Sequence, residues 1–146
     1  MKKLEFKTVI AAPVNKVWDT MLQPDSYKQW IGGGWPDSFF EGKLEQGEKI
    51  SFLSKEGGGT LAEIKKLSMH EYILFVHVAV ILPGNIKDTT SELARGWIGI
   101  TESYSFEKKD QGTELTINIT TNTAWEKMFM DGWPGALQQL KELCEK

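Results

Sequence analysis

The sequence predicts an α+β fold in which a curved antiparallel sheet of about six or seven strands is covered by one long C-terminal helix. Three observations predict this fold. Between residues 35 and 121, apolar and polar residues mainly alternate with a period of two, which is typical of strands. Over residues 124–146, apolar residues recur every three or four positions, and they do so again in two short segments within 13–31. A helix laid across one face of the sheet buries both apolar surfaces.

The N-terminal third predicts one strand and two short helices. Apolar residues alternate with charged ones over residues 4–10, which indicates a strand. Pro13 suits the first position of a helix, and Pro24 ends that helix about three turns later. Asp25 can cap a second helix, which ends at Trp30 just before three consecutive glycines.

The middle of the chain predicts the rest of the sheet. The segment 71–82 is apolar on both faces, which indicates a central, well-covered strand. Residues 83–94 have the composition of a loop. The other strands are predicted around residues 50–52, 62–64, 98–106 and 115–119.

The C-terminal segment predicts a helix of roughly 31 Å, at about 1.5 Å per residue. Pro134 lies in its middle and should bend it, since proline removes a backbone hydrogen bond. Gly132 and Gly135 should leave gaps beside Trp133, so that the helix stands off the sheet and encloses a void. Two other interpretations stay open: the aromatic stripe is ordinary core, or the glycines permit close packing.

Composition narrows the class of protein. The length of 146 residues fits a single domain, residues 1–146. The net charge of −3, with both signs interspersed, gives no basic patch for nucleic acid. The only cysteine, Cys144, excludes an internal disulfide and fits a reducing compartment. No apolar run is long enough for a signal peptide or a membrane span. We therefore expect a cytoplasmic protein with no nucleic-acid partner and no membrane insertion.

Several segments resemble a known superfamily. "IAAPVNKVWDTMLQPDSYKQW" (10–30) is similar to the opening of START-like (SRPBCC) proteins, and "GTELTINI" (112–119) with "DGWPGALQQLKEL" (131–143) is similar to their close. "ESYSFEKKDQGTELT" (102–116) resembles the branch of activator of heat-shock protein 90 ATPase homologue-like proteins. The resemblance implies the helix-grip fold, also described as birch-pollen-allergen-like. It also implies a cavity between the long helix and the sheet, which in other members holds lipids, polyketides, sterols or plant hormones.

We expect such a cavity to be lined by aromatic and aliphatic side chains from the long helix, the second short helix and the inward face of the sheet. One acidic residue should lie among them, because the alternation places it on the inward face. The predicted lining residues are Trp30, Phe40, Phe52, Ile64, Ile100, Glu102, Tyr104, Trp125, Phe129 and Trp133.

Two polar residues are candidates for chemistry. An inward-facing Glu102 needs a partner such as Arg95 or Lys87, because an unpaired buried carboxylate is costly. It could anchor a ligand hydroxyl or act as an acid or base, or it could lie at the end of the sheet, in water or in a structural pair. His77 is either a ligand contact or, as for most lone strand histidines, a hydrogen-bonded structural residue. The sequence indicates no metal site, no cofactor and no catalytic constellation. Trp97 should face solvent and hint at a partner surface.

Three functions remain open at this point. The first is binding of a small hydrophobic or aromatic molecule in the cavity, without catalysis. The second is a protein-interaction module that pairs with a chaperone or with a second copy of the chain, as the branch name suggests. The third is a cyclase-like or dehydratase-like enzyme, which would have to use Glu102, His77 or Tyr104.

Overall fold

The computed structural model describes all residues, 1–146. It contains eight strands and four helices, in an order that opens with one strand and closes with the longest helix. The elements are β1 Lys2–Ile10, α1 Val14–Leu22, α2 Pro24–Ile31, β2 Phe39–Glu41, β3 Lys49–Leu53, β4 Gly59–Ser68, β5 Tyr72–Leu82, β6 Ile86–Asp88, α3 Glu92–Trp97, β7 Thr101–Lys109, β8 Gly112–Thr121 and α4 Thr123–Cys144.

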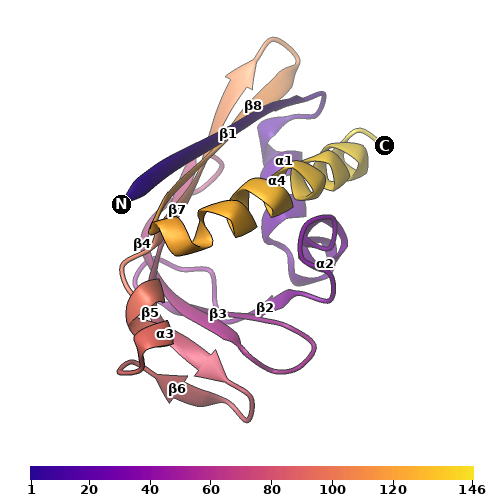
Figure 1. Cartoon of the computed structure of the whole chain (residues 1–146). Coiled ribbons are helices and arrows are strands. Elements are labelled where there is room, and N and C mark those ends of the chain that lie inside the picture. Colours follow the sequence, from indigo (N-terminus) through magenta and orange to yellow (C-terminus); the bar gives the residue numbers. More distant parts are fainter.

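All eight strands belong to one antiparallel sheet. Seven of them lie in the order β1-β8-β7-β5-β4-β3-β2, and β6 pairs with β5 outside this path. The sheet curls around α4, and α1 and α2 close the same side of the molecule (Figure 1). This arrangement confirms the predicted α+β helix-grip fold.

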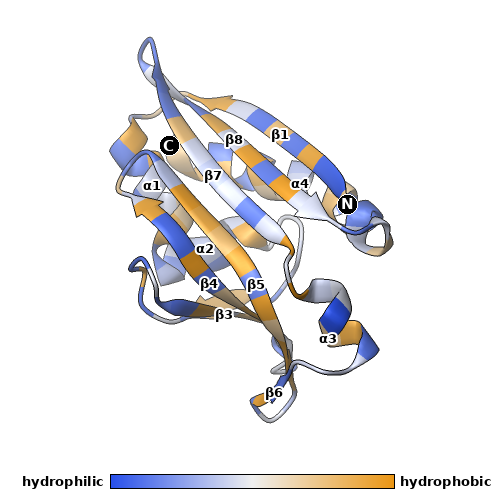
Figure 2. Ribbon diagram, turned by 90° about the vertical axis from the view of Figure 1, so that its left-hand side faces the viewer, coloured by the Kyte–Doolittle hydropathy of each residue, from blue (hydrophilic) through white to orange (hydrophobic).

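The alternation of the sequence sets the two faces of the sheet. Hydrophilic and hydrophobic residues alternate along β1 and β8 (Figure 2). On β8, Leu115, Ile117 and Ile119 are at most 1% exposed and face the core, while Asn118 between them is exposed. A strand with a period of two buries one face and leaves the other to solvent.

Helix α4 packs its apolar stripe onto the concave face of the sheet. Asn122 caps its first turn by accepting a hydrogen bond from the Trp125 backbone N–H at 3.2 Å. No helix of the chain combines the length and the apolarity needed to cross a bilayer. The buried residues of α4 are Phe129, Gly132, Trp133, Ala136, Leu137, Leu140 and Cys144.

The glycines of α4 permit close packing and do not leave the gaps that we expected. A Cβ on Gly135 would overlap the carbonyl of Gly33, and a Cβ on Gly34 would overlap the carbonyl of Gly132. The indole of Trp35 covers Gly132. The segment after α2 thus lies directly against α4 where the side chains are missing. Pro134 is exposed within the helix.

Residues 83–100 differ from the sequence prediction. The loop expected over residues 83–94 contains β6 and the start of α3, and α3 is capped by the Ser91 hydroxyl, which accepts from the Ala94 N–H at 3.1 Å. The strand expected over residues 98–106 begins only at Thr101, and Ile98 is 40% exposed, because the chain turns through Gly99 at a positive φ before β7 begins.

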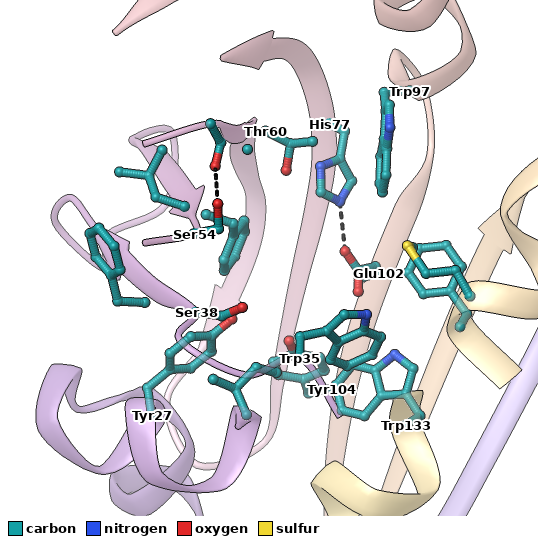
Figure 3. Close-up of a pocket in the computed structure, with 18 residues that line it drawn as sticks. Tyr27, Trp35, Ser38, Ser54, Thr60, His77, Trp97, Glu102, Tyr104 and Trp133 are labelled. Atoms are coloured by element: carbon teal, nitrogen blue, oxygen red, sulfur yellow. Dashed lines mark hydrogen bonds and ion pairs between the residues drawn. The ribbon is translucent and has the colours of Figure 1, made fainter. Parts of the chain in front are cut away.

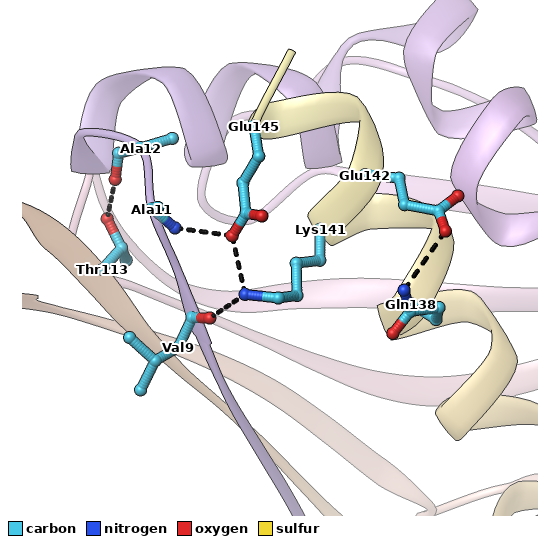
Figure 4. A network of polar contacts seen from close by, with 8 residues as sticks. All are labelled: Val9, Ala11, Ala12, Thr113, Gln138, Lys141, Glu142 and Glu145. Atoms are coloured by element: carbon cyan, nitrogen blue, oxygen red, sulfur yellow. Dashed lines mark hydrogen bonds and ion pairs between the residues drawn. The ribbon is translucent and has the colours of Figure 1, made fainter.

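The C-terminal end of α4 is fastened to the segment between β1 and α1 (Figure 4). The Glu145 carboxylate accepts hydrogen bonds from the Ala11 backbone N–H at 2.8 Å and from Lys141 Nζ at 2.6 Å. Lys141 also donates to the Val9 carbonyl at 2.8 Å. The Ala11 N–H, followed by Lys141, holds the pKa of the Glu145 carboxyl below its ordinary value.

Candidate ligand-binding cavity

A cavity of about 410 Å³ lies between α4, α2, α3 and the concave face of the sheet. This volume lies within the range of small-molecule sites, about 300–1,000 Å³. Eleven of its eighteen lining residues are hydrophobic. The lining residues are Tyr27, Ile31, Trp35, Ser38, Phe39, Phe52, Leu53, Ser54, Gly58, Gly59, Thr60, His77, Trp97, Glu102, Tyr104, Met128, Phe129 and Trp133.

Aromatic rings form the wall on the side of α4. The ring centroids of Trp35 and Trp133 are 5.6 Å apart at an interplanar angle of 81°, and those of Tyr104 and Trp133 are 5.8 Å apart at 74°. Edge-to-face pairs of this kind fix the orientation of each ring. The packing of Trp133 against Trp35 and Tyr104 therefore sets the orientation of the rings in this wall.

A hydrogen-bonded pair, His77 and Glu102, lies at the polar part of the cavity (Figure 3). Nε2 of His77 on β5 is 2.6 Å from Oε2 of Glu102 on the neighbouring strand β7. The side chain of His77 is 2% exposed and that of Glu102 is 14% exposed. A carboxylate can only accept, so we assign the proton of this bond to Nε2. Nδ1 of the same ring is buried without a partner.

This pairing corrects the expectation that Arg95 or Lys87 would pair with Glu102. Both cationic residues are exposed, Arg95 on α3 and Lys87 on β6. The strand period of two could have identified the true partner, because His77 follows the buried residues Ile73 and Phe75 on the same face of β5.

Trp97 contacts the His77 ring and does not face outward. The two ring centroids are 5.2 Å apart, and Trp97 also packs on Trp125 at 5.1 Å. The prediction that Trp97 faces solvent was wrong because it assumed a strand at this position. The residue ends α3, whose start is held by Asp88, which accepts from the Ser91 hydroxyl at 2.5 Å.

Four titratable side chains line the cavity: Tyr27, His77, Glu102 and Tyr104. Burial raises the pKa of both phenols well above the ordinary value, and the negative charge of Glu102 raises each further. Both phenols therefore remain protonated at neutral pH. No lysine or arginine lines the cavity, and no group of three or more His, Cys, Asp and Glu side chains is arranged to hold a metal ion.

Half of the ten predicted lining residues contact this cavity. They come from β3, β7 and α4, and they are Phe52, Glu102, Tyr104, Phe129 and Trp133.

The other five predicted residues lie elsewhere. Trp30 is fully buried, and its indole N–H donates to the Met21 carbonyl at 3.2 Å. Ile64 and Ile100 are likewise fully buried in the core. Phe40 borders a separate void of only about 10 Å³, and Trp125 packs behind Trp97. A period of two or 3.6 identifies the inward face, but it does not separate residues packed in the core from those that border empty space.

The prediction missed lining residues from irregular segments. Ser38 lies between α2 and β2, and Gly58 lies in the turn before β4. These segments have no periodicity that predicts their orientation. Tyr27 had a usable signal, since it precedes Trp30 by three residues and shares its helix face.

Comparisons with solved structures show the same fold. The dimer of Aha1 from Colwellia psychrerythraea superposes with a TM-score of 0.75 at 19% identity, over 99% of this chain and 97% of that one. Protein NE0264 from Nitrosomonas europaea gives 0.73 at 21% identity, over 97% and 93%. Protein MLL2253 from Mesorhizobium loti gives 0.76 at 14% identity, over 97% and 96%.

Comparison with protein families gives a match at the level of sequence. No curated protein matches the chain. The family model for activator of Hsp90 ATPase homolog 1-like protein matches residues 11–145, nearly the whole length. This match agrees with the resemblance of the segment 102–116 and with the helix-grip fold. The chain belongs to the family of activator of Hsp90 ATPase homolog 1-like proteins.

Proposed function

We propose that the protein binds a small hydrophobic or aromatic molecule in the cavity between α4 and the sheet. The observation that carries this proposal is the cavity itself: about 410 Å³, mainly apolar in its lining, with the hydrogen-bonded pair of His77 and Glu102 inside. Ligand sites are typically concave and apolar with a few polar groups that orient the ligand.

The physical basis is the burial of apolar surface. Each Å² of apolar ligand surface removed from water contributes about 25 cal/mol. The side chains of this aromatic wall need little rearrangement on binding, because Trp133 already packs edge-to-face on both Trp35 and Tyr104. Loss of ligand freedom opposes binding, so we expect dissociation constants on the order of micromolar for a molecule of two or three rings.

The test is a titration with N-phenyl-1-naphthylamine, an uncharged dye that fluoresces in apolar surroundings. We expect saturable binding to the wild-type protein. Ser38→Phe should weaken it at least about tenfold, because Ser38 is half-buried at the lining of the cavity. Gln29→Phe, on the exposed face of α2, is the matched control and should bind as the wild type does. Absence of saturable binding, or equal binding by both variants, would contradict the proposal.

A second candidate is an interaction module that forms a homodimer or binds another protein. Three exposed apolar side chains within residues 86–98 favour it: Ile86 is 57% exposed, Leu93 46% and Ile98 40%. Apolar residues gathered on a surface are common at protein interfaces. Light scattering after gel filtration tests the homodimer, which Leu93→Asp should dissociate. A monomer at all concentrations would remove this form of the candidate.

The enzyme alternative draws support from the 2.6 Å contact between His77 and Glu102. Its weakness is the position of the imidazole, because Nδ1 is sealed from the cavity and Nε2 is engaged with the carboxylate. A base must reach the proton that it abstracts. Of this pair, only the Glu102 carboxylate keeps an oxygen that is open to the cavity, which suits the anchoring of a ligand.

A further inference from the structure

We propose that the cavity selects molecules that carry a positively charged amino group on an apolar ring system, and that Glu102 binds this group. The inference rests on the proposed function and names the class of ligand. It is carried by the hydrogen bonding of Glu102, by the charges around the cavity and by the aromatic faces in its wall.

Glu102 has capacity for another hydrogen bond. Its Oε2 accepts from His77, and Oε1 has no partner in the protein. Oε1 is not fully buried, and the Glu102 side chain is 14% exposed. Because Glu102 lines the cavity, this oxygen is open to it. A carboxylate has about four acceptor positions, so a ligand ammonium group can occupy one without displacing His77.

The bond to His77 orients the carboxylate of Glu102. Nε2–H of His77 donates to Oε2 at 2.6 Å, and Nδ1 of the same ring is buried without a partner. His77 therefore holds one oxygen of the carboxylate and leaves the other, Oε1, to accept from a ligand. The negative charge of the carboxylate lies at this open oxygen as well as at Oε2.

No positive side chain of the lining opposes this charge. The titratable lining residues are Tyr27, His77, Glu102 and Tyr104, with no lysine or arginine among them. Burial raises the pKa of both phenols, and the nearby charge of Glu102 raises the pKa of each further. The same charge opposes a ligand carboxylate or phosphate and favours an ammonium group.

The aromatic wall suits a cation as well as a ring. Glu102 lies on the same side of the cavity as the indoles of Trp35 and Trp133 (Figure 3). The ring planes of Trp133 and Trp35 are at 81° to each other, so the faces of the two indoles point in different directions. Indole faces attract an ammonium group within about 6 Å of the ring centroid. An amine bound to Glu102 can therefore contact these indoles while its ring system fills the apolar part.

The test compares three naphthalene derivatives of similar size and different charge at pH 7: 1-naphthylmethylamine, 1-naphthalenemethanol and 1-naphthoic acid. Each is titrated against the protein loaded with N-phenyl-1-naphthylamine, and its displacement of the dye is measured. We expect the amine to bind at least about tenfold more tightly than the alcohol, and the acid to bind more weakly than either.

The charge of Glu102 is tested by Glu102→Gln, which keeps the shape of the side chain. We expect the preference for the amine over the alcohol to fall to about twofold or less. Glu114→Gln on β8, which lies between the buried residues Thr113 and Leu115 and faces away from the core, should keep the wild-type preference. Circular dichroism checks that both variants fold. If Glu102→Gln does not fold, the comparison of the three ligands on the wild-type protein still tests the inference.

The outcomes separate the two proposals. If the dye binds but the amine binds no more tightly than the alcohol, or the acid binds best, the amine inference is overturned and the binding function survives. If neither the dye nor any of the three ligands binds, both are overturned. If Glu102→Gln folds and keeps the full preference, Glu102 is not the residue that binds the amine, and the inference fails.

Discussion

Asn122 joins the start of α4 to the end of α3. Its Nδ2 donates to the Gly96 carbonyl at 2.6 Å, and its Oδ1 accepts from the Trp125 N–H at 3.2 Å. One side chain thereby caps the long helix and places Trp97 beside Trp125, where it also covers the His77 ring. The polar part of the cavity depends on this connection.

Replacement of Asn122 should therefore lower the free energy of unfolding, and the loss should be larger when both of its hydrogen bonds are removed than when one is. We expect Asn122→Ala to lower the free energy of unfolding by about 1–3 kcal/mol, since it removes both a cap and a second hydrogen bond. Asn122→Ser keeps a capping oxygen but removes the amide that donates to Gly96, so its loss should be smaller. Urea unfolding of the three proteins measures the order, and a Ser variant as unstable as the Ala variant would contradict the assignment of two roles.

Close packing of the segment after α2 against α4 predicts a strong effect at Gly34. A Cβ there would overlap the Gly132 carbonyl, which is backbone and cannot rotate away. We expect Gly34→Ala to lower the free energy of unfolding by about 1–3 kcal/mol. The same change at Gly96 is the control, because its Cβ would meet only ordinary contacts, the nearest at 3.6 Å from Asn122 Nδ2.

At Gly96 we expect no loss and a gain of up to about 1 kcal/mol, because alanine favours a helix. Thermal or urea unfolding of both variants gives the comparison. Equal changes in the free energy of unfolding at the two positions would contradict the close contact between residues 33–35 and α4.

The architecture followed from periodicity, whereas the details of the cavity did not. The alternation of β8 and the stripe of α4 are local consequences of a buried face, and both were predicted correctly. The pairing of His77 with Glu102 joins residues 25 positions apart, so it depends on the register of β5 against β7. Trp97 was misplaced because the short helix α3 interrupts the alternation just before β7. The glycines of α4 were interpreted as empty space because their partner, the segment 33–35, has no pattern of its own.

Glu145 should make stability depend on pH. Its pKa is lowered in the folded protein by the Ala11 N–H and then by Lys141, so its contribution is complete above the ordinary glutamate value of 4.5 and is lost as the pH falls through the folded value. We expect Glu145→Gln to have a lower Tm than the wild type at pH 7, and the difference to shrink as the pH falls below 4.5. Glu142→Gln is the control, since the exposed Glu142 carboxylate hydrogen-bonds only to the neutral side chain of Gln138. A difference that stays constant down to acidic pH would contradict the role of the carboxylate.

Two buried threonines of β8 should respond in opposite directions to the same substitution. The Thr121 hydroxyl is buried without a partner, whereas the Thr113 hydroxyl donates to the Ala12 carbonyl at 2.8 Å; both residues are fully buried. Valine keeps the branched shape and the strand preference and removes only the hydroxyl. Thr121→Val replaces an unsatisfied polar group by a methyl group, so we expect a gain of about 1 kcal/mol in the free energy of unfolding.

Thr113→Val instead leaves the Ala12 carbonyl without its donor, so we expect a loss of about 1–2 kcal/mol. Urea unfolding at pH 7 measures both changes, and the double variant should equal the sum of the single ones, because the two residues lie eight positions apart on one strand. A destabilised Thr121→Val protein would mean that this hydroxyl has a partner, such as an ordered water, and that the end of β8 next to Asn122 is more hydrated than its burial indicates.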